Sequence, residues 1–148
     1  MTQRLDYAKA SPTGFNAFLA VHSAVYKGSL PKGLVDLVYL RISQINGCAF
    51  CIDMHTRDLL KIDTRVAKLA LLSVWREGGE TFTPRERAAL AWAESVTRVI
   101  DTHVSDDDYA AAAAEFSAEE LADLTYAIAL MNAFNRFGVA FRTPPAGA

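Results

Sequence analysis

Apolar residues recur along this chain at helical spacing, and polar or glycine-containing segments separate them. In the segment 31–46 the apolar side chains return every three or four positions, at Leu34, Leu37, Val38, Ile42 and Ile45. This spacing places them on one face of an α-helix, whereas a half-buried strand would alternate at every second position. Asn46-Gly47 follows this segment and does not join two alternating strands. It therefore predicts a helix end with Gly47 in the left-handed conformation.

The same signals predict seven helices. They cover residues 12–26, 31–46, 48–61, 63–77, 83–100, a short alanine-rich stretch that begins at 105, and 117–137. Three starts have Ser or Thr followed three positions later by an acidic residue, which is the capping box or its aspartate variant: Thr83-Glu86, Ser105-Asp108 and Ser117-Glu120. Asp63 is the predicted N-cap of the fourth helix, and the predicted ends include Gly28, Gly78-Gly79 and Gly138. Residues 144–148 are typical of a frayed tail.

Length and charge narrow the class of protein. A chain of 148 residues is one domain by length and can bury a full core, so we predict an all-α, single-domain helical bundle over residues 1–148. The net charge of −2 provides no basic patch for nucleic acid or an anionic membrane. Charged residues interrupt every apolar stretch before it reaches membrane-spanning length, and residues 1–7 are polar rather than signal-like. We therefore expect a cytoplasmic protein that binds neither nucleic acid nor membrane.

Hydrophobic residues make up 51% of the chain, at the upper edge of the normal range. Helices with this much apolar surface often bury part of it between subunits. The composition therefore predicts a homo-oligomer.

The chemistry concentrates in one short segment, 48–55, which contains both cysteines and one of three histidines. On a helix, positions i, i+3 and i+7 share one face, so Cys48, Cys51 and His55 project together. Cα atoms three residues apart on a helix lie about 5 Å from each other, within the range of a disulfide. Structural disulfides are rare in the cytoplasm, so such a pair is more typical of a catalytic or metal-binding site.

These three residues can carry out thiol redox chemistry. Cys48 is predicted in the first helical turn, where the helix dipole favours a thiolate. His55 lies four residues beyond Cys51 and can exchange a proton near neutral pH. If one cysteine is oxidised to a sulfenic acid, the other can condense with it into a disulfide. An external dithiol would then regenerate the pair.

Two other readings of the pair remain open. The cysteines can be small buried hydrophobic residues with no chemistry. Alternatively Cys48, Cys51 and His55 can supply three zinc ligands, with His22, His103 or Asp53 as the fourth. Structural zinc sites usually draw ligand pairs from two segments, and this chain has no second pair. Covalent haem attachment is excluded because Ile52, not histidine, follows the second cysteine.

The segment also resembles a known family. Cys-x-x-Cys-x-x-x-His, after a helix of the form Leu-x-acidic-Leu-Val-x-Leu-x-x-Ser, is similar to the alkylhydroperoxidase D (AhpD) branch of the carboxymuconolactone decarboxylase family. The similarity is densest over residues 34–57, and Asn132-Ala-Phe-Asn-Arg136 is similar to the last helix of the family. The resemblance implies that the family's domain covers most of the chain.

The resemblance implies a helical trimer or hexamer that reduces organic hydroperoxides with its cysteine pair. Electrons would come from a dithiol donor, either a lipoyl-type group or a thioredoxin-like protein, and no cofactor or metal is expected. Cys51 would attack the peroxide and Cys48 would resolve it, whereas the helix dipole alone favours Cys48 as the attacking thiol.

Asp36 stands where the family has a glutamate that feeds a proton relay through His55, and Phe50 stands where the better-studied members have a histidine. The predicted catalytic residues are therefore Cys48, Cys51, His55 and Asp36. The alternatives are a lyase of the carboxymuconolactone decarboxylase type and a non-catalytic zinc-binding or partner-binding module.

Overall fold

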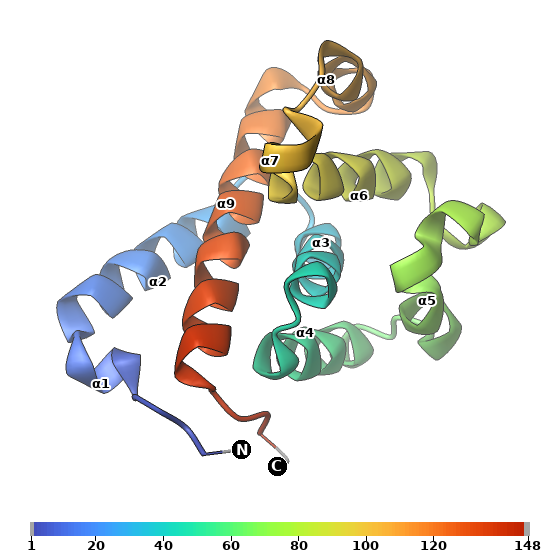
Figure 1. Ribbon diagram of the computed structural model, residues 1–148. Coiled ribbons are helices and arrows are strands. Elements are labelled where there is room, and N and C mark those ends of the chain that lie inside the picture. The colour runs from blue at the N-terminus through green and yellow to red at the C-terminus, as the bar shows by residue number, and fades with distance from the viewer. Residues whose placement is uncertain (1, 147–148) are drawn as a thin grey trace.

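The computed structural model describes residues 2–146, and all regular structure within that range is helical (Figure 1). The α-helices are α1 (Tyr7–Ala10), α2 (Pro12–Lys27), α3 (Lys32–Asn46), α4 (Ala49–Lys61), α5 (Val66–Leu71), α6 (Pro84–Thr97), α7 (Val99–Thr102), α8 (Asp106–Ala113) and α9 (Ala118–Phe141). Two 3₁₀ segments, η1 (Leu72–Glu77) and η2 (Gly79–Thr81), lie between α5 and α6. The predicted all-α fold is therefore confirmed.

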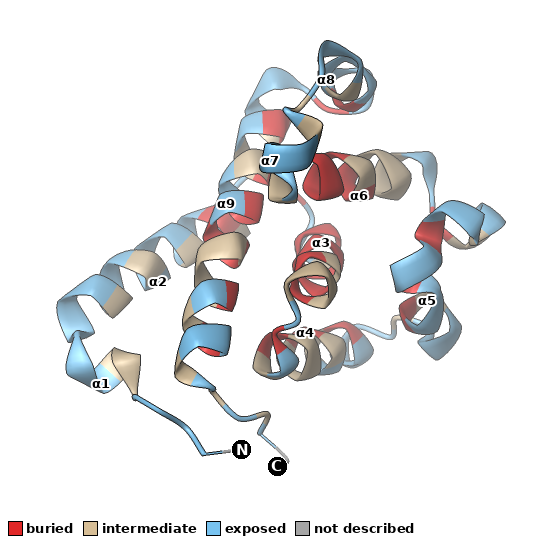
Figure 2. Cartoon of the chain, viewed as in Figure 1, coloured by how far each residue is buried: buried red, intermediate tan, exposed pale blue. Residues whose placement is uncertain are grey.

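Helix α3 forms the centre of the bundle. Figure 1 shows it end-on, with α2, α4, α6 and α9 around it, and Figure 2 shows it as the most continuously buried helix. Every residue from 34 to 40 is buried. A helix segment that is buried on all sides must have neighbours on every face, and Asp36 is the single charged residue between 34 and 40.

The core has two parts that meet at α3. In the first part, Val35, Val38 and Ile42 pack with apolar residues of α2, α6, α8 and α9. In the second part, Leu37 and Leu40 pack with residues of α4, α5, η1 and α6. The buried side chains of α3 therefore belong to both parts of the core, and they fix the position of α3 relative to the surrounding helices.

Most of the predicted helix boundaries are confirmed. Thr83 and Ser117 form complete capping boxes with Glu86 and Glu120, and the Ser105 side chain accepts a hydrogen bond from the backbone of Asp108. In a capping box two side chains satisfy backbone N–H groups that have no partner within the helix.

The predicted helix over 63–77 is wrong in its start and in its form. Asp63 has a positive φ of 57°, and Arg65 is the N-cap of α5 without a side-chain hydrogen bond. After six residues α5 gives way to the 3₁₀ segment η1. A 3₁₀ helix has three residues per turn, so Leu72 and Trp75 of η1 both lie on the buried side.

The predicted helix over 83–100 is divided. Arg98 leaves the helical conformation, with φ −101° and ψ 35°, and separates α6 from α7. The predicted end of the last helix at Gly138 is also wrong. Helix α9 continues to Phe141 and ends where Arg142 adopts a left-handed conformation.

The N-terminal segment contains a helix that the apolar pattern did not predict. Helix α1 is four residues long and is capped by Asp6. The backbone N–H of Arg4 donates to the carbonyl of Phe141, which joins the beginning of the chain to the end of α9 (Figure 1).

Of the predicted tail, residues 144–146 are irregular, and the N–H of Ala146 donates to Asp53. Residues 147 and 148 lie outside the described range. No helix among residues 2–146 is long and apolar enough to cross a membrane.

Candidate active site

The turn between α3 and α4 positions the cysteine pair. Gly47 has φ 69°, a conformation that is open to glycine but strained for most residues, so the predicted helix end is confirmed. The N–H of Cys48 donates to the carbonyl of Ser43 at 3.1 Å, which folds the chain back over the end of α3. Cys48 is the N-cap of α4, and its sulfur accepts from the N–H of Cys51 at 3.4 Å.

Cys48 and Cys51 form a disulfide, with their Cα atoms 5.3 Å apart. Both residues are buried. A Cβ built on Gly138 would lie 2.7 Å from the Cys48 sulfur, closer than two non-bonded atoms can pack. The glycine in α9 therefore lets this helix approach the disulfide, and this contact explains why Gly138 is present without ending the helix.

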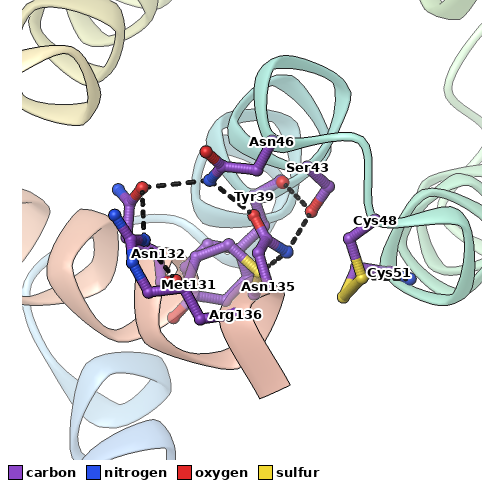
Figure 3. Close-up of a disulfide and its surroundings, with 9 residues drawn as sticks. All are labelled: Tyr39, Ser43, Asn46, Cys48, Cys51, Met131, Asn132, Asn135 and Arg136. Atoms are coloured by element: carbon purple, nitrogen blue, oxygen red, sulfur yellow. Dashed lines mark hydrogen bonds between the residues drawn. A yellow bond between two sulfur atoms is a disulfide. The ribbon is translucent and has the colours of Figure 1, made fainter. Parts of the chain in front are cut away.

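Three amide side chains hold α3 against α9 beside the disulfide (Figure 3). The Asn46 amide donates to the side-chain oxygens of Asn132 and Asn135, each at 3.0 Å. The Asn135 amide donates to the Ser43 hydroxyl at 3.0 Å, and that hydroxyl donates to the carbonyl of Tyr39. Asn135 and Ser43 are buried completely, so each hydrogen bond satisfies a group that water does not reach.

His55 lies one turn beyond Cys51 on α4 and is 1% exposed. Burial lowers its pKa to about 4, although the Asp36 carboxylate opposes this shift. Its Nδ1 is 3.9 Å from Asp36 Oδ1, beyond hydrogen-bond distance. Among residues 2–146 neither imidazole nitrogen has a hydrogen-bond partner, and the nearby Tyr39 hydroxyl has none. The imidazole is therefore neutral at neutral pH.

Asp36 lies on α3 and is 0% exposed. One carboxylate oxygen accepts from the Tyr26 hydroxyl and the other from the Lys32 ammonium. Burial and the hydrogen bond to Asp36 raise the pKa of Tyr26. The Lys32 side chain is partly exposed, so Asp36 connects the surface to the vicinity of His55.

An apolar cavity of about 260 Å³ opens beside these groups. Its wall consists mainly of aromatic and aliphatic side chains, including Tyr7, Phe15, Leu19, Phe50, Met54 and Phe134. Cys51, His55 and His22 also line it, whereas Cys48 does not. A small organic molecule in the cavity would therefore meet the sulfur of Cys51.

The three candidates for a fourth zinc ligand lie in different parts of the structure. His22, one candidate for a fourth zinc ligand, lies at the cavity wall. The other two lie elsewhere, because Asp53 pairs with Arg57 on the outer face of α4 and His103 is exposed at the end of α7. Among residues 2–146 no three His, Cys, Asp or Glu side chains are placed to hold a metal ion. No sequence pattern assigned a role to Tyr26, Ser43 or Asn135, since their polar contacts join separate helices. The Lys32–Asp36 pair lies within α3 at a spacing of four residues, which is the signal that could have indicated it.

Sequence comparison places the chain among known proteins. Residues 12–95 match the model of the carboxymuconolactone decarboxylase family. The chain is 32% identical over 140 residues to the uncharacterized protein YdfG of Bacillus subtilis, an alignment that covers 95% of each. It is 34% identical over 112 residues to the uncharacterized protein YnjA of Escherichia coli, covering 76% of this chain and 60% of that protein.

Solved structures share the fold. A protein of unknown function from Agrobacterium tumefaciens, provisionally assigned to AhpD-type antioxidant defence, has a TM-score of 0.93 and 40% identity, covering 97% of this chain and 98% of that one. An uncharacterized peroxidase-related protein from Ralstonia eutropha with an alkylhydroperoxidase AhpD core has a TM-score of 0.82 and 24% identity, covering 94% and 74%. The chain therefore belongs to the carboxymuconolactone decarboxylase family and has the AhpD-like all-helical fold.

Proposed function

We propose that the protein is a thiol-dependent reductase of organic hydroperoxides that uses Cys48 and Cys51 as a redox pair. The observation that carries this proposal is a cysteine pair within disulfide distance, of which Cys51 lies at the wall of an apolar cavity that His55 also lines. The fold shared with AhpD-type proteins supports the same assignment. In this geometry the reduced pair can transfer two electrons to a peroxide and become a disulfide.

Cys51 is the attacking thiol in this proposal, because its side chain lines the cavity and that of Cys48 does not. The Cys51 thiol gives its proton to His55, and the thiolate attacks the terminal oxygen of ROOH. The S–O bond forms as the O–O bond breaks, leaving a sulfenic acid and RO⁻. His55 returns the proton to RO⁻, which leaves as ROH. Asp36 stabilises the transient imidazolium, since its carboxylate lies 3.9 Å away.

Cys48 then resolves the intermediate. Its sulfur attacks the sulfenic sulfur of Cys51, the S–S bond forms, and hydroxide leaves as water with the Cys48 proton. A dithiol donor, either a lipoyl-type group or a thioredoxin-like protein, reduces the disulfide and becomes a disulfide itself. The cycle needs a compartment that supplies dithiols, such as the cytoplasm.

Mass spectrometry of alkylated protein tests the cycle. The reduced protein is treated with one equivalent of cumene hydroperoxide, and free thiols are then blocked. We expect both thiols to disappear together. In Cys48→Ser we expect a sulfenic acid on Cys51, and in Cys51→Ser we expect no reaction with the peroxide. Unchanged thiol counts in the wild-type protein would contradict the proposal.

The name of the family supports a second candidate, a lyase acting on a muconolactone-type acid. That reaction needs no thiol. A Cys48→Ser, Cys51→Ser double variant that still decarboxylates the lactone would favour the lyase. Loss of peroxide reduction in the same variant is required by the first proposal.

A further inference from the structure

We infer that His22 is a further catalytic residue of the proposed reductase. Its imidazole donates a hydrogen bond to the leaving oxygen of the hydroperoxide. This inference deepens the proposed function and depends on it. His22 belongs to α2, outside the 34–57 segment that carries the other catalytic candidates.

The position of His22 is the first support. His22 lines the same cavity as Cys51 and His55, but it reaches the wall from a different helix. Its ring lies 6.4 Å from the ring of Tyr39, and Tyr39 lies 5.1 Å from the ring of His55. The two imidazoles therefore flank one buried tyrosine, and a molecule in a cavity of about 260 Å³ can contact both of them.

The state of the ring is the second support. His22 is half-buried, and burial lowers its pKa, with Asp36 and Asp58 opposing the shift and Lys32 adding to it. The imidazole is thus neutral at neutral pH and has one N–H to donate. Within residues 2–146 the side-chain hydrogen bonds of this region join Tyr26, Lys32 and Asp36, and none of them uses His22. The N–H of His22 is therefore available to a ligand.

The lining of the cavity makes this donor important. Apart from Cys51, the polar side chains at the wall are His22, His55 and Tyr7, and the Tyr7 ring is stacked against Phe137 and Phe141. An alkoxide that forms in apolar surroundings is unstable unless a donor faces it. His55 holds the proton from the Cys51 thiol during the attack, so a second group is needed at the far oxygen.

In the resulting step the proton count is unchanged. The Cys51 sulfur bonds to the terminal oxygen and the O–O bond breaks. Negative charge collects on the inner oxygen, which accepts the hydrogen bond from His22. That oxygen then takes the thiol proton held by His55 and leaves as ROH. His22 keeps its own proton throughout and stabilises the transition state as a neutral donor.

The inference predicts a dependence on the leaving group. Single-turnover thiol loss is measured with cumene hydroperoxide and with peracetic acid, using wild-type protein, His22→Phe and His22→Gln. Cumene hydroperoxide must release a strongly basic alkoxide, so we expect His22→Phe to react about tenfold to a hundredfold more slowly. Peracetic acid releases acetate, a weak base, so its rate should change by less than about threefold on the same argument. His22→Gln retains an N–H donor and should recover most of the lost rate.

One control variant completes the experiment. His103→Asn removes an exposed histidine at a left-handed position that asparagine tolerates, and it should match the wild type with both peroxides. Equal slowing of both peroxides in His22→Phe, or no slowing, would overturn the inference. A wild-type protein inert to both peroxides would contradict the proposed function itself.

Discussion

At the scale of single residues, the Cys48 sulfur restricts which side chain can stand at position 138. Gly138 lies in the interior of α9, where alanine would normally be preferred by about 1 kcal/mol. At this position an added Cβ would meet the Cys48 sulfur at 2.7 Å. The Cys51 sulfur would lie 3.7 Å from the same Cβ, and the disulfide joins the two sulfurs, so they have little room for adjustment.

We therefore predict that Gly138→Ala lowers the free energy of unfolding of the oxidised protein by about 1–3 kcal/mol. Gly14→Ala is the matched control, because it lies in an exposed helical turn where the nearest atom is the flexible Ser11 hydroxyl at 3.2 Å. This control should be neutral or slightly stabilising. Urea denaturation of both variants measures the difference, and a stable Gly138→Ala variant would show that α9 can move away from the disulfide.

His55 predicts a pH dependence of stability. Burial lowers its pKa from 6.5 to about 4, so between these values the unfolded chain binds a proton that the folded protein does not. Stability from His55 is therefore fully present above pH 6.5 and is lost as the pH falls toward 4. The loss amounts to roughly 3 kcal/mol.

The comparison with His55→Gln isolates this contribution, since His22 has a lowered pKa of its own and remains in both proteins. Denaturation of the oxidised proteins at several pH values between 7 and 4 should show a steeper loss of stability in the wild type. Parallel curves would mean that the folded protein protonates His55 as readily as the unfolded chain does.

At the scale of elements, the junction of α3 with α9 determines where the cysteine turn lies. Asn135 accepts from Asn46 and donates to Ser43, and the carbonyl of Ser43 in turn accepts from the N–H of Cys48. Asn135→Leu has a similar volume but removes one of the two acceptors of the Asn46 amide and the donor to the Ser43 hydroxyl. Asn46 keeps its bond to Asn132, and Ser43 keeps its bond to the carbonyl of Tyr39. A buried polar group without a partner reduces stability by about 1–3 kcal/mol.

We expect Asn135→Leu to lower the free energy of unfolding by about 2–4 kcal/mol in total. Asn16→Leu, on the exposed side of α2, should change it by less than about 0.5 kcal/mol. Thermal denaturation followed by circular dichroism measures both. An equal, small effect of the two substitutions would show that the amide network is not important for stability.

At the scale of the whole molecule, the apolar outer face of α9 is the surface that we expect to contact another chain in the predicted oligomer. Two hollows of about 500 and 300 Å³ share Tyr126 and Ala129, and Tyr126 is 65% exposed. Exposed apolar surface of this kind is typical of protein interfaces. The oligomer that the composition predicts would bury it.

We predict that sedimentation equilibrium gives a mass that is a multiple of the mass of one chain, and that Tyr126→Glu lowers it by placing a charge in a dry contact. Thr13→Glu adds the same charge at an exposed polar position of α2 and should leave the mass unchanged. A monomeric wild-type protein would exclude the predicted oligomer.

The sequence by itself determined the features that depend on near neighbours in the chain. Apolar periodicity and the caps at Thr83, Ser105 and Ser117 established the helical class and several helix starts, because these hydrogen bonds form between residues three apart. The register of Cys48, Cys51 and His55 followed from helical geometry in the same way. The similarity over residues 34–57 indicated the family, which the comparison confirms.

Only the tertiary structure decided which distant residues meet. Gly138 resembled a helix end in sequence, but its function is to admit the Cys48 sulfur from another helix. His22 was in the sequence only one of three candidates for a fourth zinc ligand, and the packing of α2 places it at the cavity of Cys51. The sequence likewise predicted one helix over 63–77, which the structure divides into α5 and the 3₁₀ segment η1. These outcomes depend on the packing of helices far apart in the chain, and the preferences of neighbouring residues do not encode such contacts.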